Sequence, residues 1–276
     1  MAPIPIMING LPGNVARVLA THARVDARFA VVPFSLTGPD IRDRQVDIDG
    51  FTVALVRPED RDARMPPIIE AHGRPIAVDF THPSAVNANA AFYCRHGLPF
   101  VMGTTGGDRA ALQATVAASS IAAVIAPNMA KQIVGFQAML EYAADTFPGL
   151  FAGYRLRVRE SHQQGKADTS GTAKAVVQAF QRLGVDFRMD QIEMERDPDV
   201  QRKVWGVPEA YLSGHGWHTY TLDSADGTVR FEFTHNINGR EVYAQGTLDA
   251  AAYLAGKIAE GAGGRVFSMI DVLRGV

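Results

Sequence analysis

The sequence predicts an α/β protein with a doubly wound parallel sheet in its first domain and a smaller α+β unit as its second. Over the first 130 residues, short apolar runs typical of buried strands alternate with stretches of helical spacing. After Pro127 this alternation stops, and a strand with one apolar and one charged face follows. The 276 residues are enough for two modest domains, which we expect at 1–130 with 241–276 and at 131–240.

The first domain is expected to begin with a strand at 4–8, a glycine turn and a helix at 14–23. A second buried strand is expected at 29–34. A hairpin is expected at 46–53 around Asp49-Gly50, a dipeptide that tolerates positive φ. The elements that follow are a strand at 76–80, a helix at 84–96, a strand at 99–102, a helix at 108–119 and a strand at 122–125.

The second domain is expected to open with a helix over 133–147, where apolar residues recur every three and four positions. Tyr154, Leu156 and Val158 then alternate with arginines, which predicts a half-buried strand. The elements expected after it are a helix at 172–183, antiparallel strands near 186–195, 217–222 and 229–235, and helices at 241–260 and 266–273.

Composition excludes several classes of protein. Twenty-seven Lys and Arg against 29 Asp and Glu give a formal net charge of -2, so the chain has no basic field for nucleic acid or an anionic membrane. No stretch reaches the ~18 apolar residues of a membrane helix, and the N-terminus lacks a leader pattern. The single cysteine, Cys94, is expected to be a small, partly buried hydrophobe in a reducing compartment. We therefore expect a cytoplasmic protein without a nucleic-acid or membrane partner.

A glycine-rich turn joins the first strand to the first helix. In Gly10-Leu-Pro-Gly13-Asn14-Val15-Ala16, backbone amides and the helix N-terminus could bind a pyrophosphate, which predicts a Rossmann-like dinucleotide site. A purely structural turn can have the same pattern. No acid stands where a ribose-binding Asp or Glu is usual, and Ser35 and Thr37 could donate to a 2′-phosphate. This favours NADPH, with NADH as a possible second cofactor.

Two more glycine- or alanine-containing segments follow predicted parallel strands. They are Gly103-Thr104-Thr105-Gly106 and Ala126-Pro127-Asn128-Met129. Ligands of such sheets bind at the carboxyl ends of the strands, so both segments are candidates to contact a nicotinamide ring. Ordinary turn chemistry explains each segment singly about as well.

The segment 160–172 has the composition of a functional loop: Glu-Ser-His-Gln-Gln-Gly-Lys-Ala-Asp-Thr-Ser-Gly-Thr. His162 offers a group that titrates near neutral pH, and Lys166 offers a cation. Ser170-Gly171-Thr172 opens a helix, where free amides can bind a carboxylate. Together these groups suit a small dianion. In a purely structural interpretation, Ser170 caps the helix while His162 and Lys166 are solvated.

This segment resembles the E-x-H-H-x-x-K-x-D-x-x-S-G-T-A signature of the dihydrodipicolinate reductase family, also called 4-hydroxy-tetrahydrodipicolinate reductases. The resemblance extends through the glycine turn, Asp79-Phe-Thr81, 103–106, 126–129 and 267–273. The amino-acid sequences of 101–109 and of Ser161-His-Gln are most similar to the plant-type branch. The resemblance implies NAD(P)H-dependent reduction of the dehydrated form of 4-hydroxy-tetrahydrodipicolinate in diaminopimelate and lysine biosynthesis.

The resemblance also assigns roles to individual residues. His162 would be a proton donor or acceptor, and Lys166 would polarise and protonate the substrate. The implied substrate contacts are Gln163, Ser170, Gly171 and Thr172, and the implied cofactor contacts are Gly10, Gly13, Gly103, Thr104, Thr105, Ala126, Asn128 and Met129.

Two positions and one segment depart from the family pattern. Gln163 replaces the second histidine of the bacterial pair, and Ala16 replaces the third glycine of the turn. The segment 197–216 does not follow the bacterial pattern. Because that region helps to build subunit contacts in the family, we expect a homo-oligomer and leave dimer and tetramer open.

The histidines outside the signature are expected on the surface or in the core, and no metal site is expected; these are His215, His218 and His235. Arg240 either reaches the active cleft or is a turn arginine. Two other functions stay open. One is an NADP-dependent amino-acid or imino-acid dehydrogenase of similar two-domain plan. The other is a non-catalytic NADP-binding sensor, which would not require the proton donor of the signature.

Overall fold

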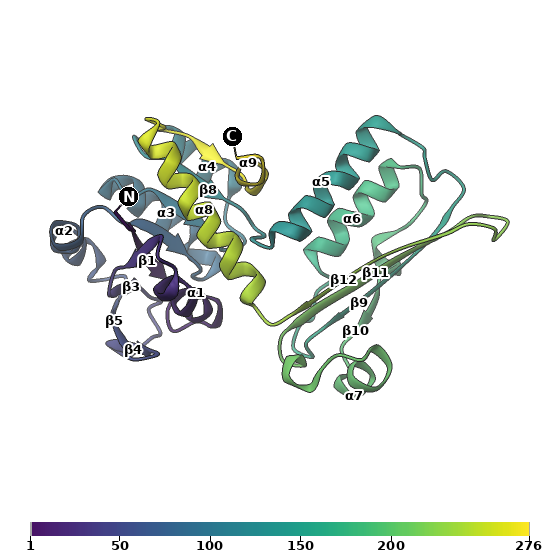
Figure 1. Ribbon diagram of the computed structural model, residues 1–276, viewed down its shortest axis with the longest axis horizontal. Helices are drawn as coiled ribbons and strands as arrows, with labels where there is room; N and C mark the ends of the chain where they lie inside the picture. Colours follow the sequence, from purple (N-terminus) through teal and green to yellow (C-terminus); the bar gives the residue numbers. More distant parts are fainter. Residues whose placement is uncertain (1, 276) are drawn as a thin grey trace. The chain divides into compact units, whose positions relative to one another are not determined.

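The computed structural model describes residues 2–275, and the chain divides into two units (Figure 1). The first unit comprises the chain up to Lys131 and from Glu241 onward, and the second comprises Gln132–Arg240. The expected fold class is confirmed, because the first unit holds a parallel sheet with helices and the second a mixed sheet with helices. Within 2–275, no helix has the length and apolar character needed to span a membrane.

The described part of the first unit contains a six-stranded sheet in the order β13-β8-β7-β6-β1-β2, and every pairing in it is parallel. Its strands are β1 (Ile4–Asn9), β2 (Phe29–Val31), β6 (Ile76–Asp79), β7 (Phe100–Met102), β8 (Ala123–Ile125) and β13 (Val266–Phe267). Its inner strands are buried on both faces, as parallel sheets require, and the side chains of Ile6 and Met7 are 0% exposed.

The helices of the first unit are α1 (Asn14–Val25), α2 (Arg61–His72), α3 (Val86–His96), α4 (Arg109–Ala117), α8 (Glu241–Ala259) and α9 (Met269–Arg274), with a 3-10 turn at Pro83–Ala85. Helix α1 packs beside α8, and α3 packs beside α4. Cys94 lies on α3 and is half-buried. A chain end that packs on the first unit was expected and is present.

The hairpin was also predicted correctly. Strands β4 (Gln45–Ile48) and β5 (Phe51–Val56) pair antiparallel, and Asp49 and Gly50 between them have φ of 53° and 81°. The strand expected at 29–34 is split. After β2, the chain passes Pro33, which has no N–H for a ladder, and β3 (Phe34–Leu36) pairs with β5 in a separate sheet.

Two further expectations for the first unit were incomplete or wrong. Helix α2 was not predicted, because Pro66 and Pro67 lie inside it and proline usually ends a helix. The segment expected to be helical from 266 begins instead as β13, which pairs with β8, and α9 starts only at Met269.

Among its described residues, the second unit has a four-stranded sheet in the order β10-β9-β11-β12. Its elements are α5 (Lys131–Thr146), β9 (Arg155–His162), α6 (Gly171–Arg182), β10 (Glu193–Glu195), α7 (Pro198–Val200), β11 (His215–Asp223) and β12 (Arg230–Asn238), with short turns at Met189–Gln191, Gln201–Trp205 and Glu209–Tyr211. Helices α5 and α6 lie over one face of the sheet (Figure 1). The core between them includes Val158, Phe180 and Tyr220, each 0% exposed.

Two details of this unit differ from expectation. Strand β10 pairs parallel with β9, so the sheet is not wholly antiparallel. Strand β9 continues to His162, so Glu160, Ser161 and His162 belong to a strand and not to the loop that was expected there. Their backbone groups pair with β11, which fixes these three side chains on a rigid element.

Candidate active site

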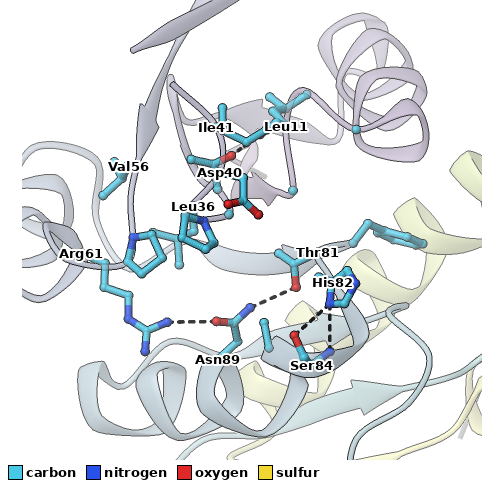
Figure 2. A pocket seen from close by; sticks show the side chains of 18 of the residues that line it. Leu11, Leu36, Asp40, Ile41, Val56, Arg61, Thr81, His82, Ser84 and Asn89 are labelled. Carbon is cyan, nitrogen blue, oxygen red and sulfur yellow. Dashed lines mark hydrogen bonds between the residues drawn. The ribbon is translucent and has the colours of Figure 1, made fainter. Parts of the chain in front are cut away.

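A pocket of about 790 Å³ opens in the first unit beside the turn after β1 (Figure 2). It is lined by the glycine turn 10–13, the segment 36–41 after β3, the segment 80–85 after β6, and Val56, Pro58, Arg61, Ala88 and Asn89. These segments follow the carboxyl ends of parallel strands, where open α/β sheets bind their ligands.

Gly10 shows why the turn needs a glycine. Its φ is +105°, and a Cβ built on it would lie 2.1 Å from the Phe80 carbonyl oxygen. Gly13 caps α1 without a side-chain hydrogen bond, so the first-turn amides of Asn14 and Val15 face no side-chain cap among the described residues. A helix N-terminus in this state favours an anion.

Ser35 and Thr37 do not present their hydroxyls to the pocket in the way we expected. Ser35 is 0% exposed, and its Oγ accepts from the Leu11 amide and donates to the Leu36 carbonyl, both at 3.3 Å. The Thr37 hydroxyl donates to the Leu11 carbonyl at 2.7 Å. Both hydroxyls therefore hold the glycine turn, and the expectation that they bind a 2′-phosphate is corrected.

A buried polar network lies under the pocket. The fully buried Asp79 carboxylate accepts hydrogen bonds from the hydroxyls of Thr81, Thr104 and Tyr93 at 2.8, 2.7 and 2.7 Å, and from Asn89 Nδ2 at 3.0 Å. Burial and the charge of Asp79 raise the pKa of Tyr93 well above its usual value. The Thr104 hydroxyl is used here, and its backbone amide donates to the Asp79 carbonyl at 3.2 Å.

The other candidate cofactor residues lie after β7 and β8 at the same edge of the sheet but outside the lining of this pocket. A Cβ on Gly103 would lie 2.2 Å from the Phe80 ring, so the ring packs directly on this backbone. Thr105 is exposed, whereas Ala126 and Met129 are 3% and 1% exposed. The side chain of Asn128 accepts from the Ala130 amide at 2.9 Å.

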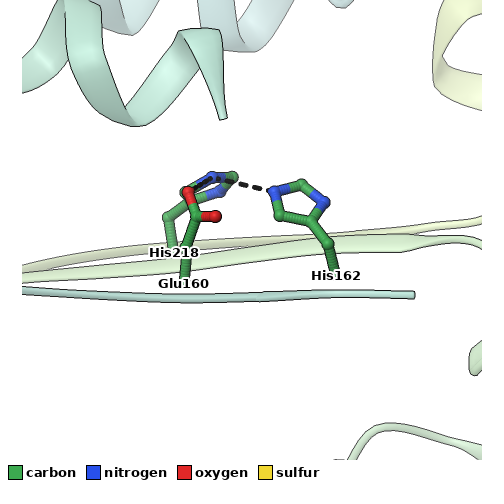
Figure 3. A group of neighbouring side chains, drawn as sticks. All are labelled: Glu160, His162 and His218. Atoms are coloured by element: carbon green, nitrogen blue, oxygen red, sulfur yellow. Dashed lines mark hydrogen bonds and ion pairs between the residues drawn. The ribbon is translucent and has the colours of Figure 1, made fainter. Parts of the chain in front are cut away.

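In the second unit, His162 ends β9 and is 9% exposed. Its Nδ1 lies 3.0 Å from the His215 carbonyl oxygen, and its Nε2 lies 3.3 Å from Nε2 of His218 (Figure 3). Burial, with a smaller contribution from the Arg196 charge, lowers the pKa of His162 to about 4. The imidazole is therefore neutral at neutral pH in the free protein.

Glu160, which is buried, and Arg196, which is half-buried, form an ion pair beside His162. Glu160 is 0% exposed, and its carboxylate accepts from Arg196 Nη2 at 2.5 Å and from the Ser170 amide at 3.0 Å. Arg196 also donates to the carbonyls of Lys166 and Glu195, at 2.8 and 2.9 Å. It thereby ties the loop 163–170 to the end of β9.

Lys166 lies in that loop with a side chain that is 20% exposed. Its Nζ is 2.6 Å from Asp168 Oδ1, and this hydrogen bond and charge lower the pKa of the Asp168 carboxyl. Asp168 itself is 77% exposed, so an anionic ligand can replace it as the partner of Lys166 at low cost.

The start of α6 is partly used within the protein. The Ser170 side chain caps the helix by accepting from the Thr172 amide at 3.2 Å, as the structural interpretation expected. Gly171 is exposed, and Gln163 and Thr172 are half-buried at the surface of the same loop and helix. These three residues remain the candidates for contact with a carboxylate.

Sequence reasoning missed three residues that surround His162. Gln201 is 0% exposed and donates to the His162 carbonyl at 2.6 Å. His215 accepts from the Ser161 hydroxyl at 2.8 Å, and His218 packs against the His162 ring. Nothing in the sequence around Gln201 indicates a role in the site. The pairing of β9 with β11 would have indicated His218, because it places His218 directly opposite Glu160. Arg240 places its guanidinium against the backbone of Gly214.

Glu160, His162 and His218 each place one potential ligand atom within 4.8 Å of the others, a spacing that a cation could use (Figure 3). The Glu160 charge is already compensated by Arg196, however. A dication would then bring uncompensated positive charge into this buried group, which is unfavourable. We assign no metal to this cluster.

The dinucleotide-type sheet and the second unit with its polar strand end define a two-domain oxidoreductase. Comparison with known proteins makes the class specific: residues 4–129 match the family model for the N-terminus of dihydrodipicolinate reductase, and residues 133–273 match the model for its C-terminus. The chain belongs to the dihydrodipicolinate reductase family.

Comparison with individual relatives supports the same family assignment. The chain is 47% identical over 270 residues to a probable 4-hydroxy-tetrahydrodipicolinate reductase 1 of Oryza sativa subsp. japonica, covering 98% of this chain and 78% of the relative. It is 48% identical over 271 residues to reductase 2 of Arabidopsis thaliana, covering 98% and 77%. The dihydrodipicolinate reductase of Paenisporosarcina sp. TG-14, solved with dipicolinate, has the same fold, with a TM-score of 0.67, 16% identity and coverage of 96% and 97%.

These relatives correct one expectation. Both plant relatives are named as chloroplastic proteins, which contradicts the predicted cytoplasmic location. The resemblance to the plant-type branch, in contrast, is confirmed.

Proposed function

We propose that the protein reduces the dehydrated form of 4-hydroxy-tetrahydrodipicolinate to tetrahydrodipicolinate with a nicotinamide cofactor, as a homo-oligomer in diaminopimelate and lysine biosynthesis. The observation that carries this proposal is the Lys166 loop, which Arg196 ties to the end of β9 next to His162. A cation, a helix start and a fixed imidazole then occupy one small region of the second unit, as a cyclic dicarboxylate requires.

The first unit fits a dinucleotide. The close approach of Gly10 to Phe80 and the uncapped start of α1 are what a pyrophosphate needs. A bound nicotinamide would supply the hydride. We propose that the cofactor is held by Gly10, Gly13, Asn14, Val15, Gly103, Thr104, Thr105, Ala126, Asn128 and Met129.

We propose that the substrate is held by charge and by backbone amides. Its carboxylates would meet Lys166 and the start of α6 at Gly171 and Thr172, with Gln163 as a further hydrogen-bonding contact. We assign the added proton to Lys166, because His162 is neutral and both of its ring nitrogens have partners. A donor placed in this way typically contributes roughly 10²–10⁴-fold in rate.

For the cofactor we propose NADPH. Ser35 no longer supports this choice, but Arg61 does, because its half-buried guanidinium lines the pocket and is fixed by Asn89 Oδ1 at 3.0 Å. Asp40 lines the same pocket from the segment after β3, is exposed, and would repel a 2′-phosphate while accepting from a ribose hydroxyl (Figure 2).

Two substitutions in the pocket should therefore change cofactor preference in opposite directions. Arg61→Gln should lower kcat/KM for NADPH by roughly 10-fold and leave NADH nearly unchanged, since a desolvated charge pair is worth about 1.4 kcal/mol or more. Asp40→Asn should raise kcat/KM for NADPH relative to NADH. Steady-state kinetics with both cofactors measures this. Equal effects of Arg61→Gln on the two cofactors would show that Arg61 does not contact the phosphate.

The proposed activity is tested by NADPH oxidation in the presence of different acceptors. We expect oxidation with the product of dihydrodipicolinate synthase, generated in the assay. We expect none with pyruvate, 2-oxoglutarate or free imino acids. Turnover of these simple acids without turnover of the cyclic diacid would favour the amino-acid dehydrogenase alternative, and binding of NADPH without any turnover would favour the sensor.

A further inference from the structure

The two ring nitrogens of His162 have partners of different kinds. Nδ1 lies 3.0 Å from the His215 carbonyl oxygen, which can only accept a hydrogen bond, so Nδ1 carries the proton of the neutral ring. Nε2 is then a lone pair, and it faces His218 Nε2 at 3.3 Å. Two lone pairs would repel at this distance, so the proton between these atoms belongs to His218. His218 therefore donates and His162 accepts.

The surroundings of His218 agree with this assignment. His218 is 3% exposed, and its Nδ1 has no hydrogen-bond partner among the described residues. With the proton on Nε2, the atom without a partner is a lone pair, whereas the opposite tautomer would bury an N–H without an acceptor and lose the contact with His162. Burial lowers the pKa of His218 well below its usual value, which keeps this ring neutral too.

The charged and titratable groups around His162 and His218 do not supply a second proton to either ring. Glu160 lies 3.8 Å from His218 Nε2, but its carboxylate is bound by Arg196 and by the Ser170 amide. On β12, His235 packs against the His218 ring with centroids 4.6 Å apart, and burial lowers the pKa of His235 to about 4.

The remaining neighbours of the two rings are Tyr220, the His215 backbone and Lys166. Tyr220 is stacked near His218 on β11, and burial raises the pKa of Tyr220 well above its usual value. The backbone carbonyl of His215 accepts a hydrogen bond from the Nδ1–H of His162, and the Lys166 cation pairs with Asp168. The two imidazoles are therefore a neutral, hydrogen-bonded pair beside a compensated ion pair.

We propose that His218 is a positioning residue of the active site: its Nε2–H donates to His162 Nε2 and so fixes the orientation and the neutral tautomer of that ring. This inference rests on the proposed function for its effect on turnover. His162 is then held from both sides, by His215 and by His218, and the proton that the substrate receives comes from Lys166.

The kinetic test compares two substitutions of similar size. His218→Gln keeps an N–H near the position of Nε2, whereas His218→Met fills the same space without a donor. We expect His218→Gln to retain kcat within about 3-fold and His218→Met to lower kcat by about 10-fold or more, with KM for NADPH unchanged in both. His235→Met removes the neighbouring ring that does not touch His162, and it should have nearly wild-type kcat.

A spectroscopic measurement tests the hydrogen bond without any variant and without turnover. In ¹⁵N-labelled wild-type protein, we expect a scalar coupling between the Nε2 atoms of His218 and His162, transmitted through the shared proton. Absence of this coupling, or equal loss of kcat in His218→Gln and His218→Met, would overturn the proposal. A protein that shows the coupling but does not reduce the cyclic diacid would instead refute the proposed function and leave the geometry intact.

Discussion

Lys166→Ala should lower kcat with the cyclic diacid by about 10²-fold or more. In the proposed reaction Lys166 pairs with a substrate carboxylate and donates the proton that follows reduction, so its removal is expected to affect the transition state more than the ground state. The loop should stay in place, because Arg196 holds it through the Lys166 carbonyl and not through the side chain. NADPH affinity and the unfolding midpoint should therefore remain close to wild type, which fluorescence titration and thermal melts measure.

Lys166→Arg separates charge from proton donation. Arginine keeps the positive charge but is effectively never deprotonated, so this variant should bind substrate and still lack most of the kcat. Lys203→Ala is the matched control, since Lys203 lies in the same unit, has a side chain that is 66% exposed and pairs with Asp199 at the surface. If Lys166→Arg retains most of the kcat, the proton comes through His162. If Lys166→Ala turns over normally, the loop has only a structural role.

Gly10→Ala should damage both cofactor binding and stability. The new Cβ would lie 2.1 Å from the Phe80 carbonyl oxygen, at a φ of +105° that side-chain-bearing residues rarely adopt. Backbone strain and overpacking each cost on the order of 1–3 kcal/mol, so the free energy of unfolding should fall by at least about 2 kcal/mol. Because the turn must move away from β6, the Kd for NADPH should rise by about 10-fold or more.

Gly38→Ala provides the control in the same pocket. No described atom lies within 4 Å of a Cβ built on Gly38, and its backbone is not in the positive-φ region. This variant should fold with an unchanged urea midpoint and bind NADPH nearly as well as the wild type. Similar losses in the two variants would show that the pocket tolerates no side chain anywhere, and that the Gly10 turn has no special part in binding.

The order of elements in the first unit could be predicted because its signals are local. Apolar runs, helical spacing and Asp49-Gly50 each act within a few residues. Two of the errors came from proline. Pro33 splits one expected strand between two sheets, and Pro66 and Pro67 obscured helix α2, whose buried Met65 and Ile68 pack on the core. In these cases tertiary packing outweighed local preference.

The site was only partly predictable, for a different physical reason. His162, Lys166 and Ser170 lie in one short segment, so their spacing indicated a shared role. Arg196 and His218 come from distant segments, and only the pairing of β9 with β10 and β11 brings them to that segment. The burial that lowers the pKa of His162 follows from this pairing and has no signature in the sequence.

The most direct test of the proposed reduction follows the hydride itself. NADPH carrying deuterium in both positions at C4 of the dihydronicotinamide ring is oxidised in the presence of the synthase product, and the tetrahydrodipicolinate formed is analysed by mass spectrometry. We expect one deuterium in the ring of the cyclic diacid for each NADPH consumed, while the second hydrogen comes from solvent through Lys166. Oxidation of NADPH that leaves no deuterium in the cyclic diacid would contradict the assignment of this protein as its reductase.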